Sequence, residues 1–444
     1  MIVAMARSVW RLLALLGAVL LPAAAAAEDA RKVLPAFAVY DANKVLQLMP
    51  ADLPALEGRE LARIRLAVVR EGVLVPIPFQ CDEYNTRGLV WFPETGVPLD
   101  GKPGVFDGND RLLMLAGDAS VESLPATLTP PAGWLGELAM TLQGETRYVQ
   151  LIAGDFPKAA ESYVQHNLNT GVTETPFYTL RVDPKNELNW QHLMVRSWRG
   201  DRERSLVDTL KMRISGGVFT SVTRLSLDND NLRPKVIGVR GGPIRSTVQL
   251  EAAVVVSGIS VMKMQAQVIR YPRYFEAFTH ARVPKLYRMA LVNPEVKVTV
   301  DGNDLRGAVV RTARGGSLQA LVDSRFDDAE RQLVARGLSS DEDWILFDTR
   351  NGFSMLTFLD VPPDLRGIPL NLVYEDDPAL RDKPERVPGQ QPNLGYGISG
   401  FPPGEDFQFG VTLSFDKDLN GVDPKQYVAR WRERPVLRFR AAGS

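Results

Sequence analysis

Residues 274–283 form the most chemically varied stretch of the sequence. Residue types alternate there with a period of two, which is the side-chain period of a β-strand. One face of this strand would carry Tyr274, Glu276, Phe278, His280 and Arg282. The other face would be mostly small and apolar, as in a core. Aromatic rings can stack on sugars and charged groups can bond sugar hydroxyls, so we interpret the first face as a candidate carbohydrate-binding surface.

Two residues on this face could also do acid–base chemistry. Glu276 and His280 are residue types that transfer protons in active sites, and we consider them as a candidate catalytic pair. Arg224, on another predicted strand, could join the ligand-binding set if that strand is a neighbour. The alternative is an exposed sheet face with a cross-strand ion pair. A concave pocket around His280 would favour the first interpretation, and a flat face the second.

The rest of the sequence offers little catalytic chemistry. It contains three histidines, His166, His192 and His280, and one cysteine, Cys81. There is no Gly-x-Ser-x-Gly, His-Glu-x-x-His or phosphate-loop motif. One cysteine and three scattered histidines do not give the ligand spacing of a zinc site. We therefore predict no cofactor, with calcium as the exception to consider.

Calcium is considered because Asp416, Asp418 and Asn420 match the first half of a calcium-binding loop. The match then ends, because the last position of a twelve-residue loop needs a bidentate Glu and this sequence has Tyr427. The alternative is turn chemistry, since Asp and Asn side chains bond their own backbone in turns. We keep the three residues as calcium candidates.

Strands must position these residues, and the pattern predicts an all-β fold. We expect an N-terminal β-sandwich over 28–155, with a hairpin around Gly144. A large twisted β-sandwich is expected over 160–444, with very little helix. One helix is predicted over 327–336, where acidic residues begin the segment and Gly337 follows it.

Two segments near the C-terminus need separate interpretation. Prolines and glycines are so frequent over 377–404 that we predict one long loop there, either a functional flap or a disordered connection. Tyr427–Arg440 is predicted to be a closing strand, with Leu437 and Phe439 facing inward.

The first 27 residues have the pattern of an export signal. Arg7 and Arg11 precede a short apolar run, and small residues up to Ala27 suit cleavage there. The alternative, a membrane anchor, would need about 20 consecutive apolar residues. No later stretch is apolar enough to be a transmembrane helix. We therefore expect a periplasmic or secreted protein.

The composition argues against one class of partner and against stabilisation by an internal disulfide. A formal net charge of −1 argues against nucleic acid as a partner. A hydrophobic content of 45% allows a sizeable core. Because Cys81 is the only cysteine, it cannot form an internal disulfide. It could pair between chains, but its place beside an apolar strand favours burial.

Two segments resemble known proteins. Pro78-Phe79-Gln80-Cys81-Asp82, followed by Phe106-Asp107-Gly108-Asn109-Asp110-Arg111-Leu112-Leu113, is similar to a module at the front of exported bacterial β-sandwich proteins, some of them glycan-associated. This sequence departs from that pattern at Cys81, Glu83 and Arg111. Gly242-Pro243-Ile244-Arg245 resembles a Gly-Pro-Val-Arg segment of large sandwiches with the galactose-mutarotase-like architecture. The resemblance implies a fold and carries over no catalytic residues.

Two functions from different classes follow. The first is a protein that binds a glycan or cell-envelope polymer through the 274–282 face, with lyase- or epimerase-type chemistry left open. The second is a structural or assembly factor of the envelope that acts through protein contacts, because strand edges can pair with a partner and catalytic motifs are scarce.

Overall fold

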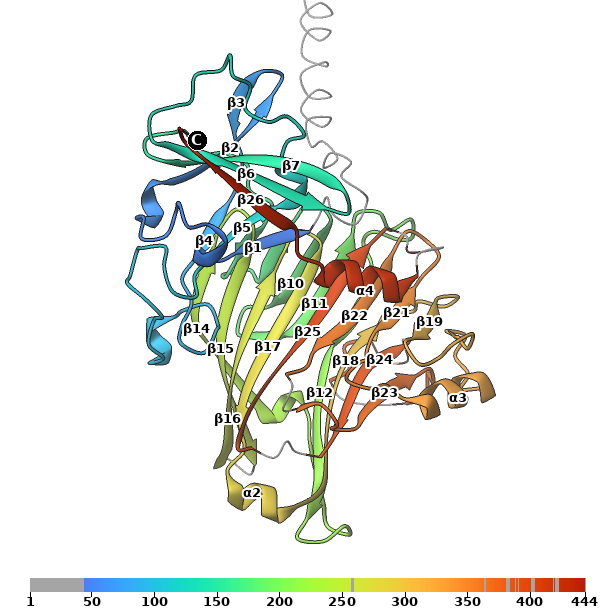
Figure 1. Ribbon diagram of the computed structural model, residues 1–444. Coiled ribbons are helices and arrows are strands. Elements are labelled where there is room, and N and C mark those ends of the chain that lie inside the picture. The colour runs from blue at the N-terminus through green and yellow to red at the C-terminus, as the bar shows by residue number, and fades with distance from the viewer. Residues whose placement is uncertain are drawn as a thin grey trace, which may run out of the picture.

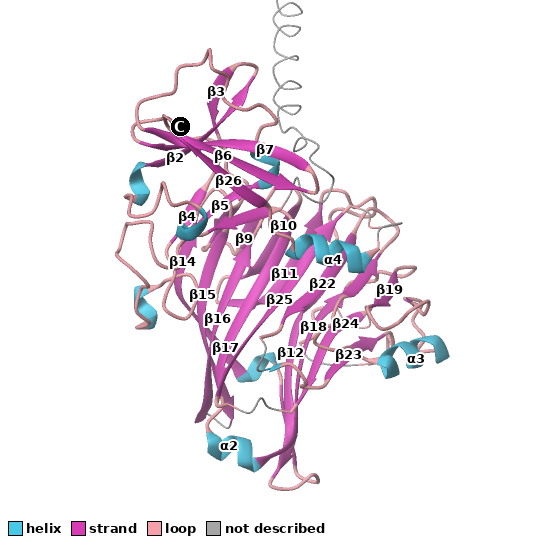
Figure 2. Cartoon of the chain, viewed as in Figure 1, coloured by secondary structure: helices cyan, strands magenta, loops and turns pink. Residues whose placement is uncertain are grey.

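The protein is built almost entirely from antiparallel β-sheets (Figure 1, Figure 2). The computed structural model describes residues 44–256, 259–362, 365–380, 384–387, 389, 391–400, 404–417, 419 and 423–443. The predicted export signal over 1–27 lies outside these residues. The predicted all-β class is confirmed, because five sheets and few helices make up the described chain.

A nine-stranded sheet, called the large sheet below, is the centre of the fold. In spatial order its strands are β14 (Leu232–Gly241), β15 (Ser246–Val256), β16 (Ile259–Arg270), β17 (Tyr274–Arg282), β25 (Asp406–Asp416), β22 (Ser354–Asp360), β21 (Ile345–Asp348), β19 (Val309–Thr312) and β20 (Ala320–Leu321). The candidate strand is therefore β17, in the interior of this sheet and paired with β16 and β25.

Two smaller sheets cover one face of the large sheet. A five-stranded sheet has the order β13 (Arg224–Leu227), β12 (Val207–Val218), β18 (Leu291–Gly302), β24 (Asn393–Ser399) and β23 (Leu370–Glu375). A four-stranded sheet has the order β11 (Asn186–Val195), β10 (Tyr178–Asp183), β9 (Val172–Glu174) and β8 (Gln165–Asn167). The main core lies between these layers and includes Phe275 and Leu413 of the large sheet, Trp190 of β11 and Tyr396 of β24.

Two further sheets, called the first unit below, stand on the other face, at one end of the large sheet (Figure 1). Its three-stranded sheet has the order β1 (Val45–Leu48), β5 (Arg111–Leu115) and β4 (Gln80–Asp82). Its five-stranded sheet has the order β26 (Val436–Ala441), β6 (Trp134–Leu142), β7 (Glu145–Ala153), β2 (Ile64–Arg70) and β3 (Val73–Pro76). The hairpin around Gly144 is confirmed as β6 and β7. Cys81 is half-buried against the core of this unit, and burial raises the pKa of its thiol.

The end of the chain differs from the prediction in two ways. Tyr427–Arg440 is not one strand, because α4 (Pro424–Arg432) precedes β26. Asp423 caps α4 by accepting a hydrogen bond from the backbone N–H of Lys425. The apolar side chains of α4 recur at helical spacing. Strand β26 then pairs with β6 of the first unit, although the sequence placed it in the second.

The predicted loop over 377–404 also contains regular structure. Asn393–Ser399 forms β24, which is paired on both sides by β18 and β23. Glycine at position 395 allows β24 to approach β18 closely, because a Cβ atom there would lie 2.2 Å from the carbonyl oxygen of Val298. Pairing on both edges supplies stability that a Pro/Gly-rich composition does not reveal.

The described chain contains two further α-helices, α2 (Lys285–Ala290) and α3 (Asp328–Arg336). The predicted helix is confirmed as α3, with a capping box between Asp327 and Glu330. Among the described residues, none of the helices is both apolar and long enough to cross a membrane.

Candidate functional site

The outward side chains of the large sheet form rows that cross its strands. Strand pairing aligns Gln265, His280 and Gln408 in one row and Gln267, Phe278, Gly410 and Asp360 in the next. A third row contains Ile269, Glu276, Thr412 and Phe358. The alternation predicted for β17 is therefore present, and Phe275 points into the main core.

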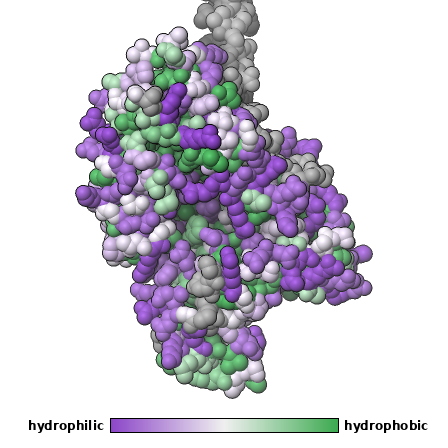
Figure 3. Space-filling view, in the orientation of Figure 1, coloured by the Kyte–Doolittle hydropathy of each residue, from purple (hydrophilic) through white to green (hydrophobic). Residues whose placement is uncertain are grey.

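This face is hollowed in its middle. In the space-filling view, a depression lies below the first unit, over the region where Figure 1 shows β17 and β25 (Figure 3). The segment that leads to Val90 lies against the sheet, because the backbone N–H of Val90 donates to Gln267 Oε1 at 3.1 Å and Gln267 Nε2 donates to the Val90 carbonyl at 2.7 Å. The first unit therefore contributes one wall of the depression.

The ring of Phe278 lies close to the neighbouring strand β25. Gly410 is its partner on β25, and a Cβ atom at Gly410 would lie only 2.6 Å from Phe278 Cε1. The missing side chain thus leaves room for the ring to cover the backbone. Phe278 stays half-buried, so part of its ring faces the solvent on the hollowed side.

His280 and Arg282 line the lower part of the face. His280 Nε2 lies 3.6 Å from Asp406 Oδ1, and the imidazole is about four-fifths buried. Burial lowers the pKa of His280, the nearby Arg87 lowers it further, and Asp406 opposes both effects. Arg282 is exposed and lies 3.4 Å from Glu405 Oε2. At neutral pH the imidazole is therefore an uncharged hydrogen-bonding group.

Glu276 lies at the upper end of the same face and is buried beneath the first unit. Burial raises the pKa of its carboxyl to about 7, although Arg245 and hydrogen bonds from Tyr271 and Thr412 favour the charged form. The sequence predicted an exposed or ligand-facing position for this residue. The structure instead places it in a polar network.

That network centres on Arg245, which is almost fully buried. Its Nε donates to Asp82 Oδ2 at 2.8 Å, its Nη1 to Tyr271 Oη at 2.7 Å and its Nη2 to Tyr84 Oη at 2.9 Å. Gln80 Oε1 accepts from the backbone N–H groups of Ile244 and Arg245. The network thus joins β4 of the first unit to the start of β15.

Two other predicted ligand-binding residues lie away from the depression. Tyr274 is 2% exposed and stacks on Tyr271, with ring centroids 4.0 Å apart, while Trp431 of α4 packs on its edge. Arg224 is exposed on β13, at the edge of the five-stranded sheet. Neither residue joins the group formed by Phe278, His280 and Gln408.

Spacing along β17 also bears on the proposed catalytic pair. Residues four apart on a strand are separated by about 13 Å. A general acid or base must reach its proton within about 3 Å or through one water. Glu276 and His280 therefore do not converge on one substrate atom, and the geometry favours binding over acid–base catalysis by this pair.

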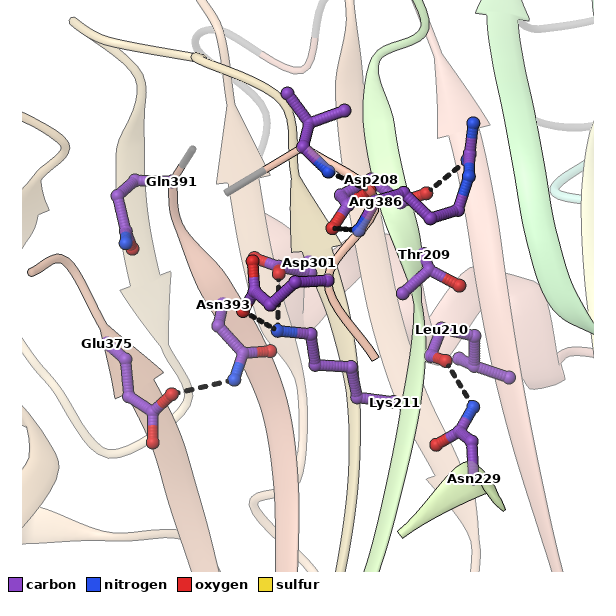
Figure 4. Close-up of polar contacts among 12 residues, drawn as sticks. Asp208, Thr209, Leu210, Lys211, Asn229, Asp301, Glu375, Arg386, Gln391 and Asn393 are labelled. Atoms are coloured by element: carbon purple, nitrogen blue, oxygen red, sulfur yellow. Dashed lines mark hydrogen bonds and ion pairs between the residues drawn. The ribbon is translucent and has the colours of Figure 1, made fainter. Parts of the chain in front are cut away.

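The described residues hold one group of carboxylates that could bind a metal ion. Oxygens of Asp208, Asp301 and Glu385 lie within 4.8 Å of one another. Lys211 Nζ already lies 2.6 Å from Asp301 Oδ2 and 2.7 Å from Glu385 Oε1 (Figure 4). Burial raises the pKa of Asp301 to about 7, against the opposing effect of Lys211. The ammonium group therefore supplies the cation of this cluster.

The same cluster fixes a nearby segment of the chain. The Asp208 carboxylate accepts from the backbone N–H groups of Arg386 and Val387, both at 3.1 Å. The Arg386 guanidinium donates to the backbone carbonyl of Asp208 (Figure 4). It also donates to the backbone carbonyls of Trp190 and Gln191. These contacts hold residues 384–387 against β12.

The calcium candidates near the C-terminus are only partly described. Asp416 is the last residue of β25 and lies 3.8 Å from Arg273 Nη1. Asp418 and Asn420 lie outside the described residues. Calcium binding by these three residues therefore stays a prediction.

Reasoning from the sequence did not assign Arg245, Tyr271, Asp82 or Gln80 to a common site. A signal was present, since Gln80 and Asp82 lie in one of the two segments that resemble known proteins and Arg245 ends the other. Their contact depends on the docking of the first unit, which local patterns do not specify.

No family model and no curated protein matches the sequence. Solved structures similar to the chain include an α-mannosidase from Enterococcus faecalis V583, with 8% identity and a TM-score of 0.45, covering 90% of this chain and 43% of that one. They also include a GalM/aldose epimerase homologue from C. elegans, with 9% identity and a TM-score of 0.32, covering 58% and 99%. A third is 4-α-glucanotransferase from Thermococcus litoralis, with 9% identity and a TM-score of 0.28, covering 55% and 37%. The chain spans less than half the length of that mannosidase, and these values assign it to no family.

Proposed function

We propose that the protein binds carbohydrate in the depression over β17 and β25. The observation that carries this proposal is the position of Phe278, which presents part of its ring in one row with Asp360 and next to the row of Gln265, His280 and Gln408. An aromatic ring can cover the apolar face of a sugar, while side chains that both donate and accept can bond its hydroxyls.

The partners around the ring support this chemistry. Gln265 and Gln408 flank His280 across the strands and are half-buried, so part of each side chain stays open to a ligand. Asp360 is exposed beyond Gly410 and adds an acceptor. The depression is open, which suits a polymer segment or the end of a chain. The export signal predicted over 1–27 would make glycans or polymers of the cell envelope the natural ligands.

Binding of the full chain to an array of neutral, uronic-acid and amino-sugar polysaccharides tests the proposal, followed by calorimetry on any ligand found. Phe278→Ala is expected to weaken binding by about tenfold or more, corresponding to about 1.4 kcal/mol. Gln408→Ala is expected to weaken it in the same direction.

Phe409→Ala is the matched control. Phe409 neighbours Gln408 on β25, but its ring is on the opposite face and stacks with Phe407. The control should leave affinity unchanged. Absence of any carbohydrate ligand, or equal affinity of the Phe278→Ala variant and the native chain, would refute carbohydrate binding at this place.

A further inference from the structure

One end of the molecule carries an exposed hydrophobic surface, called the tip below. It consists of residues 219–223, which connect β12 to β13, and of α2. The large hydrophobic side chains with the highest exposure among the described residues all lie there: Phe219 at 76%, Val222 at 88%, Leu286 at 70% and Met289 at 71%. In the space-filling view, hydrophobic residues gather at the end where Figure 1 shows α2 (Figure 3).

Strand pairing builds the tip from two segments that are distant in the sequence. Strand β12 ends beside the start of β18, which follows α2 directly, and Val218 is the partner of Leu291. The backbone N–H of Phe219 then donates to the Ala290 carbonyl at 2.7 Å. Leu286 and Met289 are three residues apart in α2 and lie on the same side of the helix. The hydrophobic side chains of both segments therefore gather at one place.

The fold itself does not require hydrophobic residues at these positions. Single exposed hydrophobic side chains are common, but a group of them in one place marks an interaction site. Phe219 also has a φ of 58°, a left-handed conformation that Gly or Asn adopts at lower cost than a bulky residue. An aromatic residue that is neither buried nor suited to its backbone conformation points to a contact outside the chain.

The sequence around the tip carries positive charge. No Asp or Glu occurs over 211–227 or over 277–294, the segments that contain the turn and α2. Arg224 and Lys285 are exposed within these segments, and Arg288 lies on α2. The hydrophobic side chains therefore project from a basic surrounding.

Two carboxylates from another segment approach this end without cancelling its charge. Glu405 Oε2 lies 3.4 Å from Arg282 Nη2, and Glu405 Oε1 accepts from the backbone N–H of Lys285 at 3.2 Å. Asp406 Oδ1 lies 3.6 Å from His280 Nε2. Against these two carboxylates stand four cationic side chains, so the net charge of the tip is positive: Arg224, Arg282, Lys285 and Arg288.

A lipid bilayer fits this combination better than a protein partner does. A stable protein interface takes about 20–30 residues on each side, more than the two short segments of the tip provide. A bilayer surface requires only apolar side chains that reach the acyl boundary and cations that meet anionic headgroups. Because the four hydrophobic side chains are exposed by 70% or more, they project far enough to enter such a surface.

We propose that the tip binds the surface of an anionic lipid bilayer. Its four hydrophobic side chains enter the headgroup region, and Arg224 and Lys285 lie beside the lipid phosphates. In this orientation the first unit stands away from the bilayer, because it packs at the opposite end of β17 from α2 (Figure 1).

A fluorescent label at the tip tests the proposal on the full chain. Cys81 is the only cysteine, so Val222→Cys in a Cys81→Ala background carries one environment-sensitive fluorophore. Its emission should shift to shorter wavelength with vesicles of phosphatidylcholine and phosphatidylglycerol, and less with phosphatidylcholine alone. The same label at Val121→Cys is the matched control and should not shift, because Val121 is 60% exposed between β5 and β6 of the first unit.

Co-sedimentation with the anionic vesicles measures the affinity. Phe219→Ser combined with Leu286→Ser should weaken binding by about tenfold or more. Arg224→Gln combined with Lys285→Gln should weaken it in the same direction and make it less sensitive to salt. Val73→Ser combined with Val121→Ser removes two exposed hydrophobic side chains from the first unit and should leave binding unchanged. None of these side chains is buried, so the variants should fold like the native chain.

A Val222 label that does not respond to anionic vesicles would overturn the proposal. Equal vesicle binding by the native chain and the Phe219→Ser, Leu286→Ser variant would do the same. Self-association that Phe219→Ser abolishes, without any response to vesicles, would assign the tip to a second copy of the chain instead. These results do not bear on carbohydrate binding, which depends on Phe278 in the depression.

Discussion

Oδ2 of Asp82 accepts a hydrogen bond from Nε of Arg245 at 2.8 Å, and both side chains are buried where the first unit meets the large sheet. Beside this pair, Gln80 bonds two backbone N–H groups at the start of β15. Gly242 makes the approach possible, because a Cβ atom there would lie 2.2 Å from Gln80 Oε1. The two segments that resemble other proteins are therefore the two halves of one joint.

Asp82→Ala is expected to destabilise the protein by about 3–5 kcal/mol, since it leaves the Arg245 guanidinium buried without its carboxylate. Urea denaturation measures the change. Lys263→Met is the control, because Lys263 and Glu251 form an exposed pair on the same sheet and such pairs contribute about 0–1 kcal/mol. Equal losses in the two variants would contradict the role of the joint.

Glu276 should make stability depend on pH. Burial raises the pKa of its carboxyl in the folded state to about 7, from 4.5. The folded state then holds a proton that the unfolded chain has released, so stability from this group is present at low pH and is lost as the pH rises through 7.

The variant Glu276→Gln isolates this effect from other buried carboxyls. Between pH 5 and pH 8, the native chain should lose more stability than the variant, as measured by urea denaturation at each pH. The free energy of unfolding of the variant should therefore rise relative to that of the native chain as the pH rises. A difference between the two proteins that stays constant over this range would show that the pKa of Glu276 is not raised.

Lys211→Met should increase the sensitivity of the protein to high pH. The pKa of Asp301 is raised by burial to about 7, and Lys211 is the cation that favours its ionised form. Without the ammonium group, ionised Asp301 and Glu385 face each other unscreened. The loss of stability between pH 5 and pH 8 should exceed that of the native chain, and adding Asp301→Asn should remove the excess. An unchanged pH profile would argue against this ion-pair cluster.

The last strand should stabilise the first unit. Phe439 of β26 packs on the core of that unit and lies close over Gly136. Phe439→Ala is expected to lower the free energy of unfolding by about 3 kcal/mol, somewhat less than the loss of a fully buried ring would. It should also raise the rate of hydrogen exchange in β6. Arg438→Ala, on the exposed face of the same strand, should do neither. If exchange in β6 did not change, β26 would contribute little to the first unit in solution.

Part of the candidate site could be predicted from the sequence. The alternation over 274–283 predicted which side chains share a face, and the register confirms that Phe278 and His280 do. Local patterns also gave the Gly144 hairpin and the helix capped by Asp327, because turns and caps depend on residues a few positions apart. The alternation over 274–283 does not indicate which other part of the chain packs on the face that carries Phe278 and His280.

The sequence by itself determined the strand faces, the turns and the all-β class, since period-two alternation and turn residues act over a few neighbouring positions. Only the tertiary structure decided that Tyr274 and Glu276 are buried while Phe278 stays partly open, because the first unit and α4 pack on one end of β17. It also decided that β24 is a strand and that β26 pairs with β6, far away in the chain. These outcomes depend on which surfaces meet after the sheets have formed, and local composition does not encode that choice.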